Sequence, residues 1–399
     1  MRKTSVALAP YPLAWWIVSN WWRLRWEPTP LVPSTDWRMS HFLPAIGDGY
    51  CWPSIGFQTD GEIIRITSLP TTGEDGASVI YHTLFSELIL AKSFEKSIES
   101  FINECNNKYF DSNISMLWNF IQDERKDKEA TIFRIIEAKL GFNIDEGPEE
   151  EINKIIEKAK YFGEKSTQEL SVLLYKESIV EKEIDGLKNH NIGTDIFIEN
   201  LYEMRKYAKQ NENKFLPWEY GYALAHEFRR SYGIESVLST EQMCKIIGTS
   251  KEKLYINSQK NSDFALGVSF GRNQYSVILN KKYPTAIRFM TARMLCDAII
   301  AEADDNVLPA TSSKTARQKI QRAFAAELLC PIELIEDRLD NNYTNEDMWN
   351  DIAEEFEVTP LLVKSQLANH SLIQQFDNAN IWFDSIQIAT PAYAINDFI

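Results

Sequence analysis

The stretch that decides the fold reads YPTAIRFMTARMLCDAII at residues 283–300 and AFAAELLCP at residues 323–331. The first run is apolar on nearly every side, which is typical of a buried helix, and we expect that helix over residues 285–303. Arg293 and Asp297 stand four residues apart in it, so a helix places their side chains on one face. Charged side chains in a buried helix require partners inside the protein.

Together the two runs resemble the core of the ImmA/IrrE family of zinc peptidases. In that family an apolar helix carries an Ala-His-Glu-x-x-His block, and a later helix supplies a carboxylate ligand shortly before a Phe-Ala-x-x-Leu-Leu-x-Pro signature. This chain has Arg293 and Asp297 at the two histidine positions and Met294 at the general-base position. Counting back from Phe324, the third ligand position falls near Gln318.

The substitutions remove the chemistry that the resemblance implies. Two histidines four apart on a helix hold one Zn²⁺, and the intervening Glu activates the metal-bound water. Arg293 has no lone pair to donate, Met294 cannot take up a proton, and Gln318 is a weak zinc ligand. Asp297 alone is a single ligand. We therefore expect an inactive relative of the family, with no metal and no cofactor.

A physical hypothesis follows for the side chains that replace the metal. Arg293 and Asp297 would pair in the vacated cavity, with Arg322 as a third member, and balance their charges there. In the alternative interpretation both side chains face solvent. A further alternative is a hard-cation site in which Asp297 joins the acidic residues 302, 304 and 305.

The order of elements around this core predicts a mostly helical α+β protein. Two helices (217–234 and 236–248), two strands (263–270 and 274–280), the motif helix and the signature helix follow each other. We divide the chain as follows: residues 1–75, an aromatic-rich α+β module; 76–212, a helical region; 213–373, the degenerate peptidase domain; and 374–399, an apolar tail. In the first of these helices Ala225-His226-Glu227 mimics the start of a zinc motif but lacks its second histidine.

The aromatic residues at the two ends of the chain are the candidates for binding a partner. They are Trp15, Trp16, Trp21, Trp22, Trp382 and Phe383. The four N-terminal tryptophans suit the core of a small module at least as well as a docking surface. Within that module, strands on either side of Asp60-Gly61 predict a hairpin, whereas residues 80–89 carry a helical apolar stripe.

Composition restricts the partners. A net charge of −15 and acidic residues around a helix-turn-helix pattern at 349–367 disfavour DNA. Five scattered cysteines without a Cys-x-x-Cys pair predict neither a disulfide framework nor a thiolate zinc site, and are consistent with the cytoplasm. We expect no membrane contact and a protein as the partner.

The leading functional hypothesis is an inactive, peptidase-like protein with a binding or regulatory role. The resemblance implies a bacterial setting such as phage defence, a toxin–antitoxin pair or a stress response. The alternatives are an active metal-dependent hydrolase with a non-standard site and a transcriptional regulator.

Overall fold

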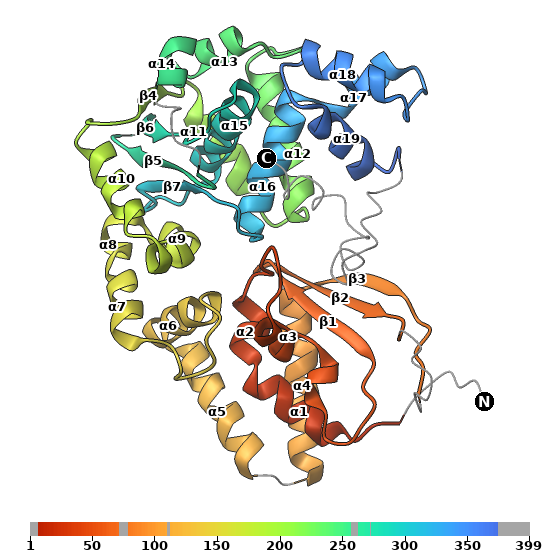
Figure 1. Ribbon diagram of the computed structural model, residues 1–399. Coiled ribbons are helices and arrows are strands. Elements are labelled where there is room, and N and C mark those ends of the chain that lie inside the picture. Colours follow the sequence, from red (N-terminus) through yellow and green to blue (C-terminus); the bar gives the residue numbers. More distant parts are fainter. Residues whose placement is uncertain (1–6, 72–78, 110–111, 257–261, 272, 374–399) are drawn as a thin grey trace. The chain divides into compact units, whose positions relative to one another are not determined.

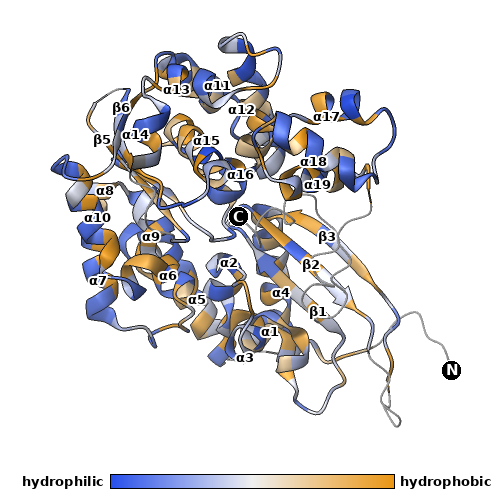
Figure 2. Cartoon of the chain, turned by 45° about the horizontal axis from the view of Figure 1, so that its top comes forward, coloured by the Kyte–Doolittle hydropathy of each residue, from blue (hydrophilic) through white to orange (hydrophobic). Residues whose placement is uncertain are grey.

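The computed structural model describes residues 7–71, 79–109, 112–256, 262–271 and 273–373. Two compact units make up the chain, residues 1–156 and residues 157–399 (Figure 1). Each unit combines helices with one small antiparallel sheet, which confirms the mostly helical α+β class. Amphipathic helices such as α7 and α10 carry both hydrophobic and hydrophilic residues along their length (Figure 2).

The first unit begins with three short helices and a three-stranded sheet and ends with four helices. Its elements are α1 (Pro10–Ser19), α2 (Trp21–Trp26), α3 (Thr35–His41), the 3-10 helix η1 (Leu43–Ile46), β1 (Ser54–Thr59), β2 (Ile63–Leu69), β3 (Phe85–Leu90), α4 (Ala91–Tyr109), α5 (Ser112–Lys126), α6 (Lys128–Lys139) and α7 (Glu149–Glu157). The last of these helices reaches the boundary between the units.

The sheet of the first unit has the order β1-β2-β3, with both neighbours antiparallel. The predicted hairpin is confirmed: β1 and β2 flank Asp60 and Gly61, and Gly61 has a φ of 99°, which glycine adopts without strain. The helical stripe predicted for residues 80–89 is wrong. Residues 85–90 form β3, which pairs with β2, and the helix starts only at Ala91.

Two sets of apolar contacts hold the first unit together. Helix α4 covers one face of the sheet, with Phe94 packed near Ile64 of β2. Helices α1, α2, α4, α5 and α6 share another core, in which Trp21 meets Trp118 edge-on with ring centroids 5.1 Å apart. The N-terminal aromatic residues therefore pack against helices as far along the chain as α6.

The second unit contains the stretch that the sequence singled out. Its elements are α8 (Ala159–Phe162), α9 (Glu164–Lys176), α10 (Ile179–Lys188), β4 (Thr194–Phe197), α11 (Leu201–Asn211), α12 (Pro217–Ser231), α13 (Thr240–Ile246), α14 (Lys251–Ile256), β5 (Ala265–Ser269), β6 (Gln274–Ile278), α15 (Pro284–Ile300), β7 (Val307–Ala310), α16 (Ala316–Leu329), α17 (Ile332–Leu339), α18 (Glu346–Glu355) and α19 (Pro360–Asn369).

Its sheet is antiparallel throughout, in the order β4-β6-β5-β7, and has helices on both faces (Figure 1). The predicted β5–β6 hairpin is confirmed, whereas the edge strands β4 and β7 were not predicted. Leu266 and Val268 of β5 face α9 and α10. Ala265, which precedes Leu266 and therefore faces the opposite side of the sheet, belongs to the core around α15.

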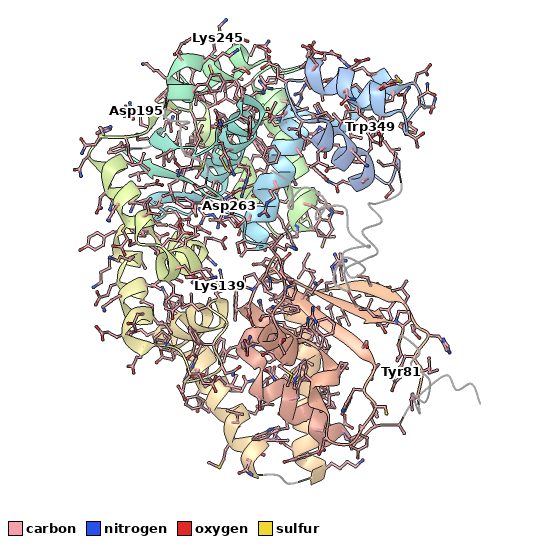
Figure 3. All side chains as sticks on the ribbon, viewed as in Figure 1. Tyr81, Lys139, Asp195, Lys245, Asp263 and Trp349 are labelled. Atoms are coloured by element: carbon pink, nitrogen blue, oxygen red, sulfur yellow. The ribbon has the colours of Figure 1, made fainter. Side chains whose placement is uncertain are left out.

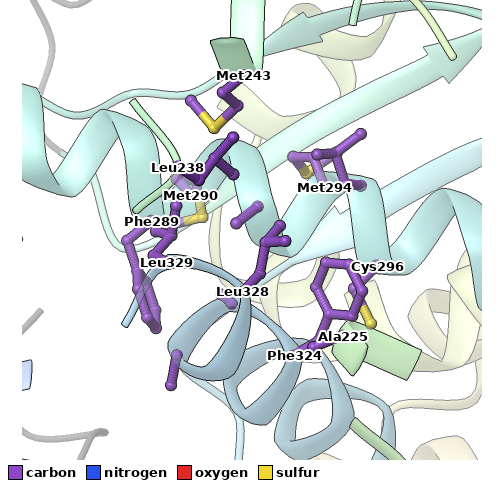
Figure 4. Close-up of a cluster of buried hydrophobic side chains, with 14 of the residues drawn as sticks. Ala225, Leu238, Met243, Phe289, Met290, Met294, Cys296, Phe324, Leu328 and Leu329 are labelled. Atoms are coloured by element: carbon purple, nitrogen blue, oxygen red, sulfur yellow. The ribbon is translucent and has the colours of Figure 1, made fainter. Parts of the chain in front are cut away.

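The predicted motif and signature helices are α15 and α16, and α16 packs against both α15 and α12. Figure 4 shows this apolar core, with Met294 of α15 and Phe324 and Leu328 of α16 among its members. Nearly every side chain of α15 is buried, as its composition predicts. Any charged residue on the facing sides of α15 and α16 is therefore enclosed by protein.

Candidate functional site

The two helices bring together three of the four positions that the resemblance assigns to zinc chemistry. Arg293 and Asp297 of α15 and Gln318 of α16 are all buried and belong to one hydrogen-bonded network. The strand β7 and the turn after it contribute backbone carbonyls to this network. We call it the buried polar cluster and define it as Arg293, Asp297, Asp305, Arg317, Gln318 and Gln321.

Arg293 is held by neutral acceptors. Its Nη2 donates to the Thr311 carbonyl at 2.7 Å, to Gln318 Oε1 at 2.6 Å and to Gln321 Oε1 at 3.2 Å. Burial lowers the pKa of Arg293 to about 10, against the opposing effect of Asp297. The guanidinium therefore remains charged at neutral pH, at the position that the resemblance assigns to the first histidine.

The predicted pairing of Arg293 with Asp297 is wrong, because Asp297 is bound by Arg317. Arg317 donates from Nε to Asp297 Oδ1 at 2.7 Å and from Nη2 to Oδ2 at 2.9 Å, a bidentate geometry. Gln321 lies between the two residues that were expected to pair: its amide accepts from Arg293 and donates to Asp297 Oδ1 at 2.7 Å. Both carboxylate oxygens of Asp297 are therefore already in use.

The positive and negative charges of the cluster balance. Arg317 bonds to Asp297 and, through Nη1 at 3.0 Å from Oδ2, to Asp305. Together with Arg293, the cluster contains two arginines and two aspartates. Burial raises the pKa of Asp297, and the adjacent Arg317 opposes that rise. Burial would lower the pKa of Arg317, but Asp297 and Asp305 outweigh it, so the pKa is raised.

Gln318 has both ends of its amide committed. Its Oε1 accepts from Arg293 and from the Thr311 N–H at 2.8 Å, while its Nε2 donates to Glu169 Oε2 at 3.2 Å and to the Pro309 carbonyl at 3.1 Å. Arg322, expected as a third member beside Arg293 and Asp297, donates to the carbonyls of Thr311 and Ser313. It is joined to Arg293 through the shared Thr311 carbonyl.

Met294, at the position that the resemblance assigns to the general base, faces the sheet and not the buried polar cluster. Met294 packs against β5, so closely that a Cβ added at Gly267 would lie 2.9 Å from the Met294 Cε. The neighbouring Cys296 is fully buried, and burial raises the pKa of its thiol well above the usual value. A protonated, enclosed thiol is not a nucleophile.

The donor set of the cluster does not suit a metal. Arginine nitrogens have no free lone pair, and the oxygens of Asp297 and Gln318 already accept hydrogen bonds. The acidic alternative does not assemble either, since Glu302 and Asp304 are exposed whereas Asp305 is bound by Arg317 and Ser166. Among the described residues, no group of three or more His, Cys, Asp and Glu side chains is placed to hold an ion.

The candidate partner-binding tryptophans lie in different environments. Trp16, Trp21 and Trp22 are buried, and Trp22 Nε1 donates to Glu124 Oε2 at 3.1 Å within the first unit. Trp15 is 41% exposed. Trp382 and Phe383 lie outside the described residues.

The helix-turn-helix pattern corresponds to α18 and α19, and the second of these helices is largely buried. Its residues from Leu362 to Asn369 pack near α16 and α17. Arg288 of α15 ties this pair to the core by donating to the Phe356 carbonyl at 3.2 Å and to the Leu238 carbonyl at 2.7 Å. A helix enclosed in this way does not present a face to the DNA major groove.

Arg317 and Gln321 were not among the predicted site residues, and Asp305 was named only in the alternative cation site. A signal existed: residues 317, 318 and 321 place three long polar side chains at helical spacing on the side of α16 that faces α15. Figure 3 draws the side chains of the described residues as sticks, those of these two helices among them. A buried aspartate on one helix and a polar face on the next are each other's expected partners.

No protein-family model, curated protein or solved structure matches the chain. No helix in the described part of the chain is both long enough and apolar enough to cross a membrane.

Proposed function

We propose that the second unit is a zinc-peptidase scaffold that has lost its metal chemistry and now serves as a protein-binding or regulatory component. One observation carries this proposal: the three ligand positions meet between α15 and α16 and form a charge-balanced, hydrogen-bonded cluster. A site adapted to hold Zn²⁺ would present free nitrogen or oxygen lone pairs to a single point.

The loss of the general base supports the same conclusion. Catalysis on zinc-bound water needs a carboxylate beside the metal, and this position holds a methionine packed on the sheet. The resemblance that leads to this proposal also implies a bacterial setting, in phage defence, a toxin–antitoxin pair or a stress response.

A restored site tests the scaffold. The variant Arg293→His, Met294→Glu, Asp297→His and Gln318→Glu returns the ligands and the base to their expected positions. We expect this variant to bind one zinc per chain by elemental analysis, whereas the wild-type protein does not. A variant with Gln318→Glu alone is the matched control, since it adds one carboxylate without the histidines.

A folded restored variant that takes up no more zinc than the control would contradict the proposed scaffold. Near-ultraviolet circular dichroism establishes whether it has folded. Loss of the fold is addressed by the two-residue variant Arg293→His with Gln318→Glu, which leaves the Asp297–Arg317 pair in place, supplies two of the three ligands and should still take up more zinc than the control.

Binding of a protein partner is tested separately at Trp15, the exposed member of the described tryptophan candidates. If Trp15 anchors a partner, replacing it with alanine weakens that complex by about 2 kcal/mol or more. Tyr202, 73% exposed on the second unit, provides the control substitution. Equal affinities for wild type and Trp15→Ala would remove Trp15 from the interface.

A further inference from the structure

The outer edge of strand β3 in the first unit is open. Strand β3 ends the order β1-β2-β3 and pairs with β2. The Ala91 N–H, one residue after the strand, donates to the Glu62 carbonyl on the β2 side at 2.9 Å. Main-chain groups alternate in direction along an antiparallel strand, so those of Ser86, Leu88 and Leu90 point away from β2. In the described part of the chain, no residue pairs with these outward groups.

The chain itself covers the outer sides of the other edge strands. At β1, Phe42 forms a bridge to Gly56. At β4, the Phe197 N–H donates to the Ile247 carbonyl at 2.8 Å. At β7, the Pro309 carbonyl accepts from two glutamines of α16. Among the described strands, β3 is therefore the edge that lacks such a cover.

Strand β3 also lacks the features that prevent an open edge from pairing. Open edges are commonly protected by lysine, proline or a β-bulge. The strand contains neither lysine nor proline, and its one charged residue is Glu87. Leu84, just before the strand, is 61% exposed, and Leu90 is 57% exposed. An exposed apolar strand with free main-chain groups is a template for one further strand.

The sequence of β3 is complementary to itself. A two-fold axis at Leu88 sets this residue against its own copy and sets Ser86 against Leu90 of the second chain. Every outward N–H and C=O of these three residues then has a partner. In this register Glu87 lies opposite the second copy's Ile89, so that the two carboxylates do not oppose each other.

The helix on this sheet leaves room for the arrangement. Helix α4 covers one face, with Phe94 packed near Ile64 of β2. A two-fold axis perpendicular to the sheet keeps both copies of α4 on that same face. The two β2 strands would then be about 14 Å apart, three strand spacings. Packed helices need only about 8–10 Å between their axes.

We propose that β3 is a dimerisation edge, at which two copies of this chain join their sheets in antiparallel fashion with Leu88 on the two-fold axis. One pair of short strands buries little surface, so the affinity expected is in the micromolar range. The net charge of −15 on each chain opposes association, and salt screens this repulsion. The proposal does not rest on the proposed peptidase-like scaffold.

Substitutions at position 88 test both the dimer and its register. Leu88→Glu places two carboxylates across the axis and should weaken the dimer about tenfold or more, as measured by sedimentation velocity of the full chain. Leu88→Lys should have the same effect, and an equimolar mixture of the two variants should restore the dimer. Leu31→Glu is the matched control, since Leu31 is 66% exposed in the same unit. This control should associate as wild type does.

A wild-type protein that stays monomeric throughout the micromolar range, at about 0.3 M salt, would overturn the proposal. A dimer that Leu88→Glu leaves unchanged, or a mixture of the two variants that stays monomeric, would equally overturn it. If the Leu88 variants do not fold, Leu90→Lys decides, because it changes an exposed side chain of the edge and should weaken the dimer. An unchanged dimer in that variant would also contradict the proposal.

Discussion

At the scale of single residues, the buried polar cluster shows how charged side chains are balanced inside a helical core. Asp297 cannot remain buried without a counter-charge, and Arg317 supplies it in bidentate geometry. The sequence located the positions but not the partner. An Arg placed four residues before an Asp is the weaker order on one helix, and α16 offers a better-aligned guanidinium.

The first prediction concerns this pair. Asp297→Ala leaves Arg317 with only Asp305, and should lower the free energy of unfolding by about 3–5 kcal/mol. A double-mutant cycle with Arg317→Ala should give a coupling of about 1–3 kcal/mol by urea unfolding. The exposed Asp123–Lys126 pair, at a distance of 2.9 Å, is the control and should show the small coupling usual for surface pairs. Equal couplings for the two pairs would show that burial adds nothing to the interaction.

A second prediction concerns His41 in the first unit. Its ring is fully buried and stacks on Trp37 with centroids 4.1 Å apart, and burial lowers its pKa to about 3. A lowered pKa contributes stability that is present above about 6.5 and is lost as pH falls toward the folded value, at about 1.4 kcal/mol per pH unit.

His41→Gln removes this titration. Relative to wild type, the variant should gain stability as the pH is lowered from about 6.5, as measured by urea unfolding followed by tryptophan fluorescence. His82→Ala changes an exposed histidine of the same unit and should leave the wild-type profile unaltered. A constant difference between wild type and His41→Gln at every pH would show that His41 titrates equally in the folded and unfolded chains.

At the scale of elements, long periodic segments were predictable and short ones were not. Helices α12, α15 and α16 and both hairpins follow from the sequence because their patterns extend over many residues. Residues 85–90 show where this fails. Their run of apolar residues fits a helix stripe, but β2 has an open edge that only a further strand can pair. Pairing between distant segments is not encoded in local periodicity.

The contact between α12 and α16 gives a third prediction. A Cβ added at Gly221 would lie 2.6 Å from the Ile320 carbonyl oxygen and 2.9 Å from the Phe324 nitrogen, atoms of a helix backbone that cannot move aside. Gly221→Ala should therefore destabilise by about 1–3 kcal/mol despite the higher helix propensity of alanine.

Gly186 provides the matched substitution. It also lies within a helix, α10, but an added Cβ would meet the flexible end of the Ile192 side chain, 2.8 Å away. Gly186→Ala should cost much less than Gly221→Ala in thermal unfolding of the same chain. If Gly221→Ala is the more stable variant, then α12 and α16 do not pack as closely as described.

At the scale of the whole molecule, the predicted domain boundaries lie near residues 75 and 212, whereas the contacts divide the chain into two units at residue 156. Each predicted boundary separates segments that pack together, for the following reasons. Strand β3 and helices α4–α6 complete the sheet and core of the aromatic segment, and α9 and α10 cover a sheet face of the second unit. A small module can bury its aromatic side chains only by packing against these later helices.

Under the proposed function, the buried polar cluster occupies the place of a zinc ion. Elemental analysis of the purified wild-type protein, grown with zinc in the medium, is the most direct measurement. We predict no stoichiometric zinc, because every oxygen of Asp297 and Gln318 is engaged and Arg293 cannot coordinate. One tightly held zinc per chain that disappears in Asp297→Ala would contradict the claim.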